Sequence, residues 1–241
     1  MTTASVAAKG VTVAARWLAR DPDTMTAKDR IKDMRRSALH SHLAVYDGRH
    51  TDALERVAVA LQSDAGAAQT LVDIAAAQPC GLAASAATWV LLRLCKDSRA
   101  RRLEPALILR LRTVLTEADH WETRLHVLQT LSVVEVSSVL IRPQRESIAK
   151  AAMRCATDPQ PFVVAWAVNV LGLLGGDLSK KMQAHIALLI HNADRHGPAS
   201  TRARLRQLRK AGRLEWLDHI PEALSDPDAD NGTKPLGRGS A

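Results

Sequence analysis

The sequence predicts an all-α protein, folded as a right-handed α-solenoid of about four to five helical hairpins. The first observation is a repeated segment, found at residues 122–134, 163–175 and 200–212 and, in a looser form, at 86–96. The copies begin roughly 36–41 residues apart, a period typical of stacked helical hairpins. Each copy follows a polar or Pro/Gly-containing break, as the first helix of a hairpin would.

The second observation is the spacing of apolar residues within the copies. They recur every third residue, so they share one face of a helix. The stripes are Ala86, Trp89 and Leu92, then Leu125, Leu128 and Leu131, then Ala165, Val168 and Leu171. One hairpin cannot bury such a face alone, whereas a stack of hairpins can. We therefore expect Leu128 and Val168 to be among the most buried residues, and we expect no sheet.

Breaks and composition divide the 241 residues into four regions. We expect residues 1–26 to be a flexible segment with a short helix at 11–20, which the following Asp-Pro-Asp turn ends. Residues 27–50 are interpreted as an N-terminal capping helix, and residues 51–220 as the repeat domain. Residues 221–241 are polar and rich in Gly and Pro, so they cannot offset their ordering entropy and should be disordered.

The capping helix is expected over residues 27–45, before the break at Asp47 and Gly48. Lysines and arginines are spread around much of this helix. Its apolar side is expected to hold Ile31, Met34, Ala38 and His42 or Leu43.

The expected hairpins then follow in order. They pair residues 51–61 with 67–77, 83–96 with 104–116, 121–134 with 144–156, and 162–174 with 179–193. A last, half-complete unit has a helix at 200–211 and a short segment at 214–219. Pro105 and Pro143 lie in the first turns of two second helices, where a helix tolerates proline. Gly175 and Gly176 supply the turn within the last full pair.

Composition limits the classes of function. The net charge of +8 and the pI of about 9.9 predict weak attraction to nucleic acid, anionic lipid or an acidic protein. Aromatic residues make up 3% of the chain, which is a poor supply for sites that stack nucleobases. Cys80, Cys95 and Cys155 form no CxxC pair, and the last two fall in amphipathic segments as small hydrophobes. A reducing compartment fits this pattern, and neither a disulfide nor a zinc site is expected.

Residues 158–175 resemble a HEAT repeat, as do 121–131 and 201–208. HEAT units typically place an Asp-Pro turn before a first helix of the form V-R-x-x-A-x-x-x-L-G. The residues that match this pattern are Asp158, Pro159, Val163, Ala167, Leu171 and Gly172. The arginine of the pattern is present as Arg124 in the preceding copy, and Val164 replaces it in this one. The chain is also similar to bacterial HEAT-like proteins that carry WE-x-R-LH-x-LQ and FV-x-AWA segments. The resemblance implies an armadillo-type fold and no activity.

Candidate sites for chemistry are sparse. His40 and His42 are two residues apart, which on a helix turns them about 160° from each other. Residues 172–176 lack the glycine spacing of a phosphate-binding loop, and no GxSxG, HExxH or CxxC signature occurs. We therefore expect no catalytic residue, no cofactor and no metal.

Tryptophans and arginines are the candidate partner-binding residues. Trp89 and Trp166 occupy similar positions in two repeats, and Trp121 begins another; they could pack in the core or line a binding groove. Basic residues gather in three runs, at 28–36, 93–112 and 202–213. The residues that we expect to contact a partner are Trp121, Arg124, Trp166, Arg110, Arg112, Arg202, Arg204, Arg206, Arg209 and Arg213.

The last basic run forms one cationic side of its helix, with Leu208 opposite. Its members are Arg202, Arg206, Arg209, Lys210 and Arg213. Two interpretations are open. The side chains could form the solvated outer face that a terminal repeat needs, or they could contact a polyanion or an acidic protein. Both interpretations predict that these guanidinium groups are exposed.

The favoured function is a non-catalytic protein–protein interaction scaffold or adaptor. Its concave face, lined by the second helices of the hairpins, would hold a protein partner of unknown identity. The alternative is weak, sequence-independent binding to the phosphate backbone of nucleic acid, or to another polyanion, through the basic faces. The apolar stretches fall short of the ~20 residues that a membrane span needs, so we expect a cytoplasmic protein. The acid-free residues 1–20 leave an organelle as the alternative location.

Overall fold

The computed structural model describes residues 26–96 and 103–220, and all regular structure within them is helical. This confirms the all-α prediction: the described residues contain eleven α-helices, two 3-10 helices and no strand. The short helix expected at 11–20 and the tail at 221–241 lie outside the described residues.

The helices begin and end close to the predicted bounds. They are α2 (Ala27–Leu43), α3 (Asp52–Leu61), α4 (Ala67–Ala77), α5 (Leu82–Lys96), α6 (Pro105–Glu117), α7 (Trp121–Val133), α8 (Val136–Val139), α9 (Arg142–Cys155), α10 (Pro161–Leu174), η2 (Gly175–Asp177), α11 (Lys180–His196), α12 (Ala199–Lys210) and η3 (Glu215–His219). Pro105 and Pro161 occupy the first positions of α6 and α10, where the absent N–H has no intrahelical partner to lose. The single-turn α8 has no counterpart in the sequence prediction.

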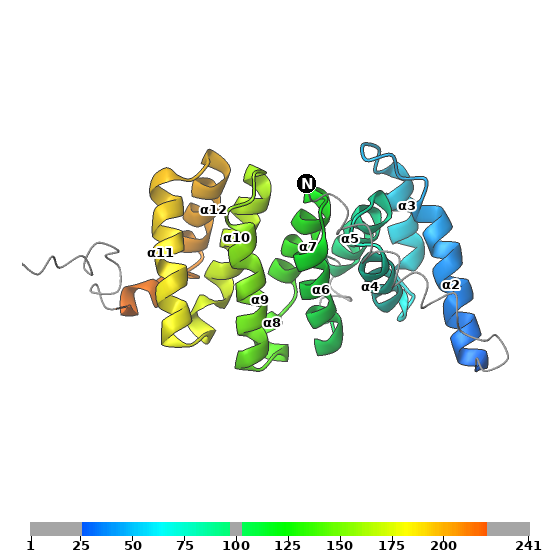
Figure 1. Ribbon diagram of the computed structural model, residues 1–241, viewed down its shortest axis with the longest axis horizontal. Helices are drawn as coiled ribbons and strands as arrows, with labels where there is room; N and C mark the ends of the chain where they lie inside the picture. The colour runs from blue at the N-terminus through cyan, green and yellow to red at the C-terminus, as the bar shows by residue number, and fades with distance from the viewer. Residues whose placement is uncertain (1–25, 97–102, 221–241) are drawn as a thin grey trace, which may run out of the picture.

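The helices follow one another along the long axis of the molecule in chain order, with α2 and α3 at one end and α11 and α12 at the other (Figure 1). Two series of neighbours run along this axis. In the first layer α3, α5, α7, α10 and α12 pack against one another in that order. In the second layer α2, α4, α6 and α9 do the same. The layers are joined because α4 packs on α5, α6 on α7, α9 on α10 and α11 on α12.

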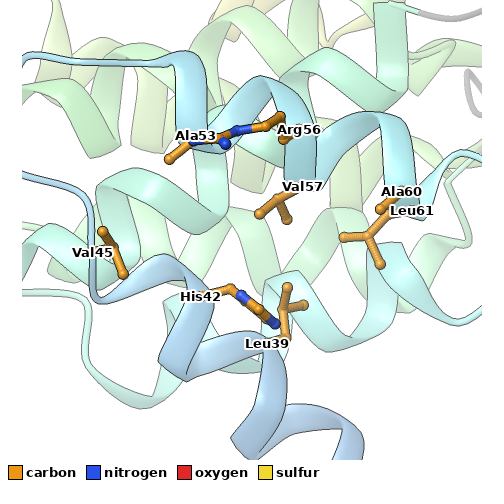
Figure 2. A pocket seen from close by; sticks show the side chains of 8 residues that line it. All are labelled: Leu39, His42, Val45, Ala53, Arg56, Val57, Ala60 and Leu61. Atoms are coloured by element: carbon orange, nitrogen blue, oxygen red, sulfur yellow. The ribbon is translucent and has the colours of Figure 1, made fainter.

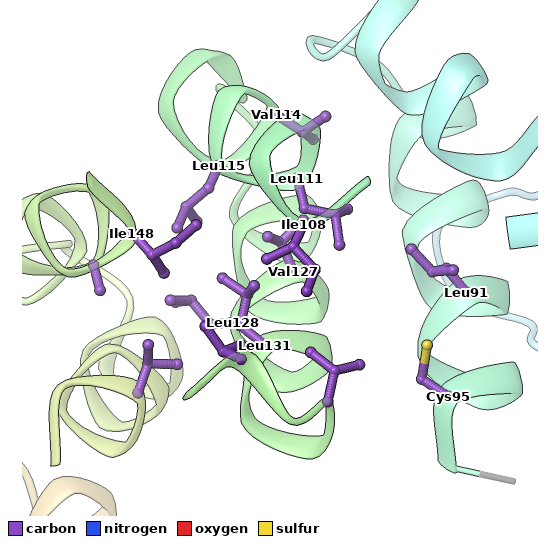
Figure 3. Close-up of a cluster of buried hydrophobic side chains, with 14 of the residues drawn as sticks. Leu91, Cys95, Ile108, Leu111, Val114, Leu115, Val127, Leu128, Leu131 and Ile148 are labelled. Atoms are coloured by element: carbon purple, nitrogen blue, oxygen red, sulfur yellow. The ribbon is translucent and has the colours of Figure 1, made fainter. Parts of the chain in front are cut away.

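The hydrophobic core lies between the two layers. Leu128 on α7 and Val168 on α10 are both fully buried, which confirms the expected orientation of these helices. Figure 3 shows Leu128 among side chains from α5, α6 and α9 as well as α7, including Leu91, Ile108 and Ile148. Each helix therefore completes the core of its neighbours rather than a core of its own.

The expected apolar face of α2 is wrong at Met34 and Ala38, whereas Leu43, one of the two alternatives for its last position, is buried as expected. Met34 is 65% exposed, and Ala38 and His42 are also exposed, whereas Leu39 and Leu43 are buried. The helix carries apolar residues on two sides, and its contacts with α4 and α5 select the side that holds Leu39 and Leu43. Periodicity alone could not choose between these sides, because the choice depends on where the neighbouring helices lie.

Polar side chains join neighbouring helices at a constant separation in sequence. Ser85 Oγ on α5 donates to Glu122 Oε2 on α7 at 2.9 Å, across 37 residues. Asn169 Nδ2 on α10 donates to Ser132 Oγ on α7 at 2.9 Å, again across 37 residues. Arg154 Nη2 on α9 donates to Thr116 Oγ1 on α6 at 3.0 Å, across 38 residues. Successive helices in both layers therefore meet in the same register, and its period is the one found in the sequence.

His126 lies in the core between α5 and α7. Its Nδ1 is 3.3 Å from the Ser85 carbonyl oxygen and 3.4 Å from Thr88 Oγ1. Burial lowers the pKa of His126 to about 4, because the charged imidazolium would lose its hydration.

Replacing Leu128 with Ala is expected to lower the free energy of unfolding by about 2–5 kcal/mol, through lost burial and the cavity left behind. The free energy is measured by urea denaturation monitored by circular dichroism. The matched control is Val59→Ala on α3, where the side chain is 62% exposed and the cost should stay below about 0.5 kcal/mol. Equal effects of the two substitutions would contradict the described core.

Acid should destabilise the protein through His126. Because its pKa in the folded state, about 4, lies below the unfolded value, the unfolded chain binds the proton first as pH falls below about 6.5. The wild type should therefore lose on the order of 3 kcal/mol more stability than His126→Gln between about pH 7 and pH 4. Parallel stability profiles of the two proteins over this range would show that the imidazole is not enclosed.

Candidate functional site

The two sides of α12 differ sharply in chemistry. Leu205 and Leu208 are buried against the preceding helices, whereas Arg202, Arg206 and Lys210 are exposed. Arg213 follows the helix and is also exposed. We call these four cations (Arg202, Arg206, Lys210 and Arg213) the α12 basic surface. The exposure predicted from the sequence for Arg202, Arg206, Arg209 and Arg213 is confirmed.

The end of α12 keeps Arg213 near the last helical turn. Gly212 has a φ of 68°, a left-handed conformation that costs glycine little. This turn lets the Arg213 N–H donate to the Leu208 carbonyl oxygen at 3.0 Å, as in a glycine-based helix cap.

A tryptophan that was not among the predicted site residues holds this end of the chain in place. Trp216 on η3 donates from Nε1 to the Gly172 carbonyl oxygen on α10 at 3.1 Å. A Cβ at Gly175 would overlap the Trp216 ring, and one at Gly172 would lie 2.8 Å from Leu208 Cδ1. The glycines of residues 172–176 therefore make room for α12 and η3. The glycines at the end of α10 were visible in the sequence. The sequence did not indicate that Trp216 and Leu208 would pack against them.

The arginines of α12 differ in how they are paired. Arg209 forms two hydrogen bonds with Asp194 on α11, from Nη1 to Oδ1 at 3.2 Å and from Nη2 to Oδ2 at 2.6 Å. These bonds to Arg209 lower the pKa of the Asp194 carboxyl. Arg202, Arg206 and Arg213 make no side-chain hydrogen bond or ion pair with any described residue. Within the described residues these three guanidinium groups are exposed, and the charge of Arg202 contributes to lowering the pKa of Asp194.

Arg204 and Trp166 are brought together across α10 and α12. The guanidinium carbon of Arg204 lies 3.9 Å from the Trp166 ring centroid, and Arg204 Nη1 donates to Gln207 Oε1 at 2.9 Å. Partial burial lowers the pKa of Arg204, because its charge is less well hydrated. The pair is half-buried and lies on another side of α12 from Arg202 and Arg206, because residues two apart on a helix point about 160° away from each other. A cation over an aromatic face is attracted to it, so this contact also fixes α12 on α10.

The other two tryptophans of the described residues, Trp89 and Trp121, pack on the core. Trp121 begins α7, is half-buried, and stacks on His120 with 6.3 Å between ring centroids. Trp89 on α5 is also half-buried and packs against the core. Trp89, Trp121 and Trp166 therefore pack against the core, which is one of the two roles that the sequence allowed. Each remains partly exposed.

Arg124 is held by the interior of the array. Its Nε donates to Asp158 Oδ2 at 2.7 Å, and its Nη1 donates to the carbonyl oxygens of Ala118 and Asp119, each at 2.9 Å. These bonds join the turn before α7 to the turn before α10. The side chain of Arg124 is only 17% exposed. All three of its contacts are therefore structural.

Arg110 and Arg112 lie on α6, in the middle of the array and away from α12 (Figure 1). Arg110 forms an ion pair with Asp73 on α4. Arg112 donates from Nη2 to Thr113 Oγ1 at 3.3 Å, and its buried Nε has no hydrogen-bond partner among the described residues. The ten candidate residues thus fall into separate groups, of which the α12 basic surface is the most accessible.

The described part of the chain holds few side chains arranged for catalysis or metal binding. His40, His42, His185, His191 and His196 are all exposed. Within residues 26–96 and 103–220 no three or more His, Cys, Asp or Glu side chains converge as metal ligands would. Among the described helices, none has the length and apolar character to cross a bilayer.

Comparison with known proteins adds no family. No protein-family model, no curated protein and no solved structure significantly matches the chain.

Removing the partner of Arg124 should cost more than removing the partner of an exposed arginine. Asp158→Asn is expected to lower the free energy of unfolding by about 2–4 kcal/mol, because it leaves an enclosed guanidinium without its counter-charge. The control is Glu55→Gln, whose pair with Arg93 is 43% exposed on both sides and should be worth less than about 1 kcal/mol. Chemical denaturation measures both values, and comparable losses would contradict the internal role of Arg124.

Proposed function

We propose that this chain is a non-catalytic scaffold whose helical array holds a partner protein. The observation that carries the proposal is that some arginines form ion pairs within the array whereas others do not. Arg93, Arg110, Arg124 and Arg209 each form an ion pair with a neighbouring element. The α12 basic surface, by contrast, presents Arg202, Arg206 and Arg213, which form no ion pair with a side chain of the described residues. Charges left unpaired on a helix that is firmly packed on its other side are suited to a partner of opposite sign.

The proposed architecture is a right-handed, HEAT-like solenoid of four to five hairpins. Support comes from the register described above, in which side chains 37 or 38 residues apart join equivalent helices. The bond between Arg124 and Asp158 further supports it, because the resemblance to HEAT repeats implies such an Asp–Arg contact between repeats. Stacked repeats offer an extended, rigid surface that binds without catalytic residues.

The proposed partner is a protein with an acidic surface. A net charge of +8 would steer such a partner toward the chain, and the α12 basic surface would set its orientation. The half-buried Trp166 and Arg204, on another side of α12, supply residue types that often anchor protein interfaces. A reducing compartment such as the cytoplasm belongs to this proposal, because Cys95 and Cys155 are buried free thiols and Cys80 is an exposed one.

The scaffold proposal is tested with purified full-length chain in three forms. These are the wild type, the variant Arg202→Gln/Arg206→Gln/Arg213→Gln, and a matched control, Arg49→Gln/Arg56→Gln/Lys96→Gln. The control removes the same charge from exposed positions elsewhere on the array. A protein captured from the native source is purified and titrated against each form. Binding should weaken at least about tenfold for the α12 variant and far less for the control. Equal weakening would contradict an oriented interface at α12.

The second candidate function is binding to the phosphate backbone of nucleic acid. The exposed, unpaired arginines of α12 favour it, because such cations release counterions from a polyanion. Micromolar or weaker association with DNA or RNA is expected at low salt, and it should largely disappear near physiological salt. The α12 variant should bind less than the control at unchanged thermal stability, as fluorescence anisotropy and thermal denaturation would show. Tight, sequence-selective binding at high salt would contradict the scaffold proposal.

A further inference from the structure

An apolar groove separates α2 from α3 at the N-terminal end of the array (Figure 2). Leu39 and His42 on α2 face Val57 and Leu61 on α3 across the groove, which has a volume of about 470 Å³. A smaller cavity of about 210 Å³ shares Leu39, His42 and Leu61, so the opening extends along α2 toward Arg35.

The groove lies between two helices whose counterparts elsewhere in the array pack directly against each other. Further along the chain, each second-layer helix packs on the first-layer helix that follows it, as α4 packs on α5 and α6 on α7. Here α2 packs on α4 and α5 instead, and the α2–α3 contact is slight. Val45 at the opening is 72% exposed and Val59, outside the groove on α3, is 62% exposed, so this end of the array exposes apolar side chains. A terminal repeat of this kind needs a cover.

Residues 11–20 have the pattern of a helix that would fit the groove. Placed on a helix, Val11, Ala14 and Leu18 share one side, and Thr12, Arg16 and Arg20 share the other. The apolar side could enter the groove while both arginines face water, so no charge would be buried against Arg56 and His42 on the groove walls.

The length of chain permits this placement. The six residues from 21 to 26 can span about 20 Å, and Leu39 lies about 18 Å along α2 from its first residue. So short a tether also gives the segment a high local concentration, which favours it over an outside helix or a second copy. We propose that residues 11–20 dock as a helix in the groove between α2 and α3 and complete the N-terminal end of the array.

Disulfide trapping in the full-length chain tests this placement. Leu18→Cys is combined with Val57→Cys, which lies in the groove, or with Val59→Cys, which lies on the same helix outside it. Both pairs carry Cys80→Ser, which removes the exposed thiol and leaves only buried ones. Circular dichroism verifies that each variant folds.

Under mild oxidation, the Val57 pair should close within one chain at least about tenfold faster than the Val59 pair, because only the first brings the two thiols into bonding range. Non-reducing gels and mass spectrometry measure the linkage. Equal rates, or no closure of the Val57 pair, would overturn the proposal. Disulfide-linked dimers as the main product would also overturn it and assign the groove to a second copy.

Hydrogen exchange provides a second measurement without introduced thiols. Leu18→Asp places a charge on the apolar side of the segment, so the amides of α3 should exchange at least about tenfold faster than in the wild type. Arg16→Asp changes the outward side and should leave the exchange within about twofold. If neither substitution changes exchange in α3, the segment does not cover the groove.

Discussion

Every feature of this molecule depends on the close packing of successive first-layer helices. α7 touches α5 on one side and α10 on the other, and it has little surface left for solvent. Small residues make this approach feasible: Ala84, Ala86 and Ala87 on α5 are fully buried, as is Ala167 on α10. Close packing of this kind tolerates neither a cavity nor an extra methyl group well, so each helix fixes the position of the next.

Close approach also explains which polar groups the core contains. Ser85, Thr88 and His126 are buried: Ser85 Oγ donates to Glu122, Thr88 Oγ1 donates to the Ala84 carbonyl oxygen, and His126 Nδ1 lies near the Ser85 carbonyl oxygen. Tyr46, which follows α2, donates to Glu122 at 3.4 Å and so reaches the same network from 76 residues away. Both the burial of this hydroxyl and the nearby carboxylate raise its pKa to about 12. Because polar groups in a dry interface must be matched, these contacts fix the register more strictly than apolar packing alone would.

The sequence predicted the helices and the core of the array, but not how its surface residues are used. Leu128 and Val168 were predictable because an apolar stripe with a helical period leaves one choice of buried face. The orientation of α2 was not predictable, since Leu39 and Met34 lie on different faces and either could be buried. The basic surface of α12 was predictable for the same reason as the core, because its leucines and arginines segregate cleanly. The contact of Arg124 with Asp158, 34 residues later, was implied only by the resemblance to HEAT repeats, because an isolated arginine does not itself indicate which aspartate it meets.

The two ends of the array use opposite chemistry, and this bears on how the protein remains a discrete unit. A stack of similar helices can grow by adding another copy at either end. At the C-terminal end, like charges on the α12 basic surface disfavour a second α12 surface placed against it. The N-terminal end is more apolar, because Val45 and Val57 line the groove between α2 and α3, although Arg35 and Arg56 also lie there. Docking of residues 11–20 in this groove, as proposed above, would cover an apolar surface on which a second copy could otherwise pack.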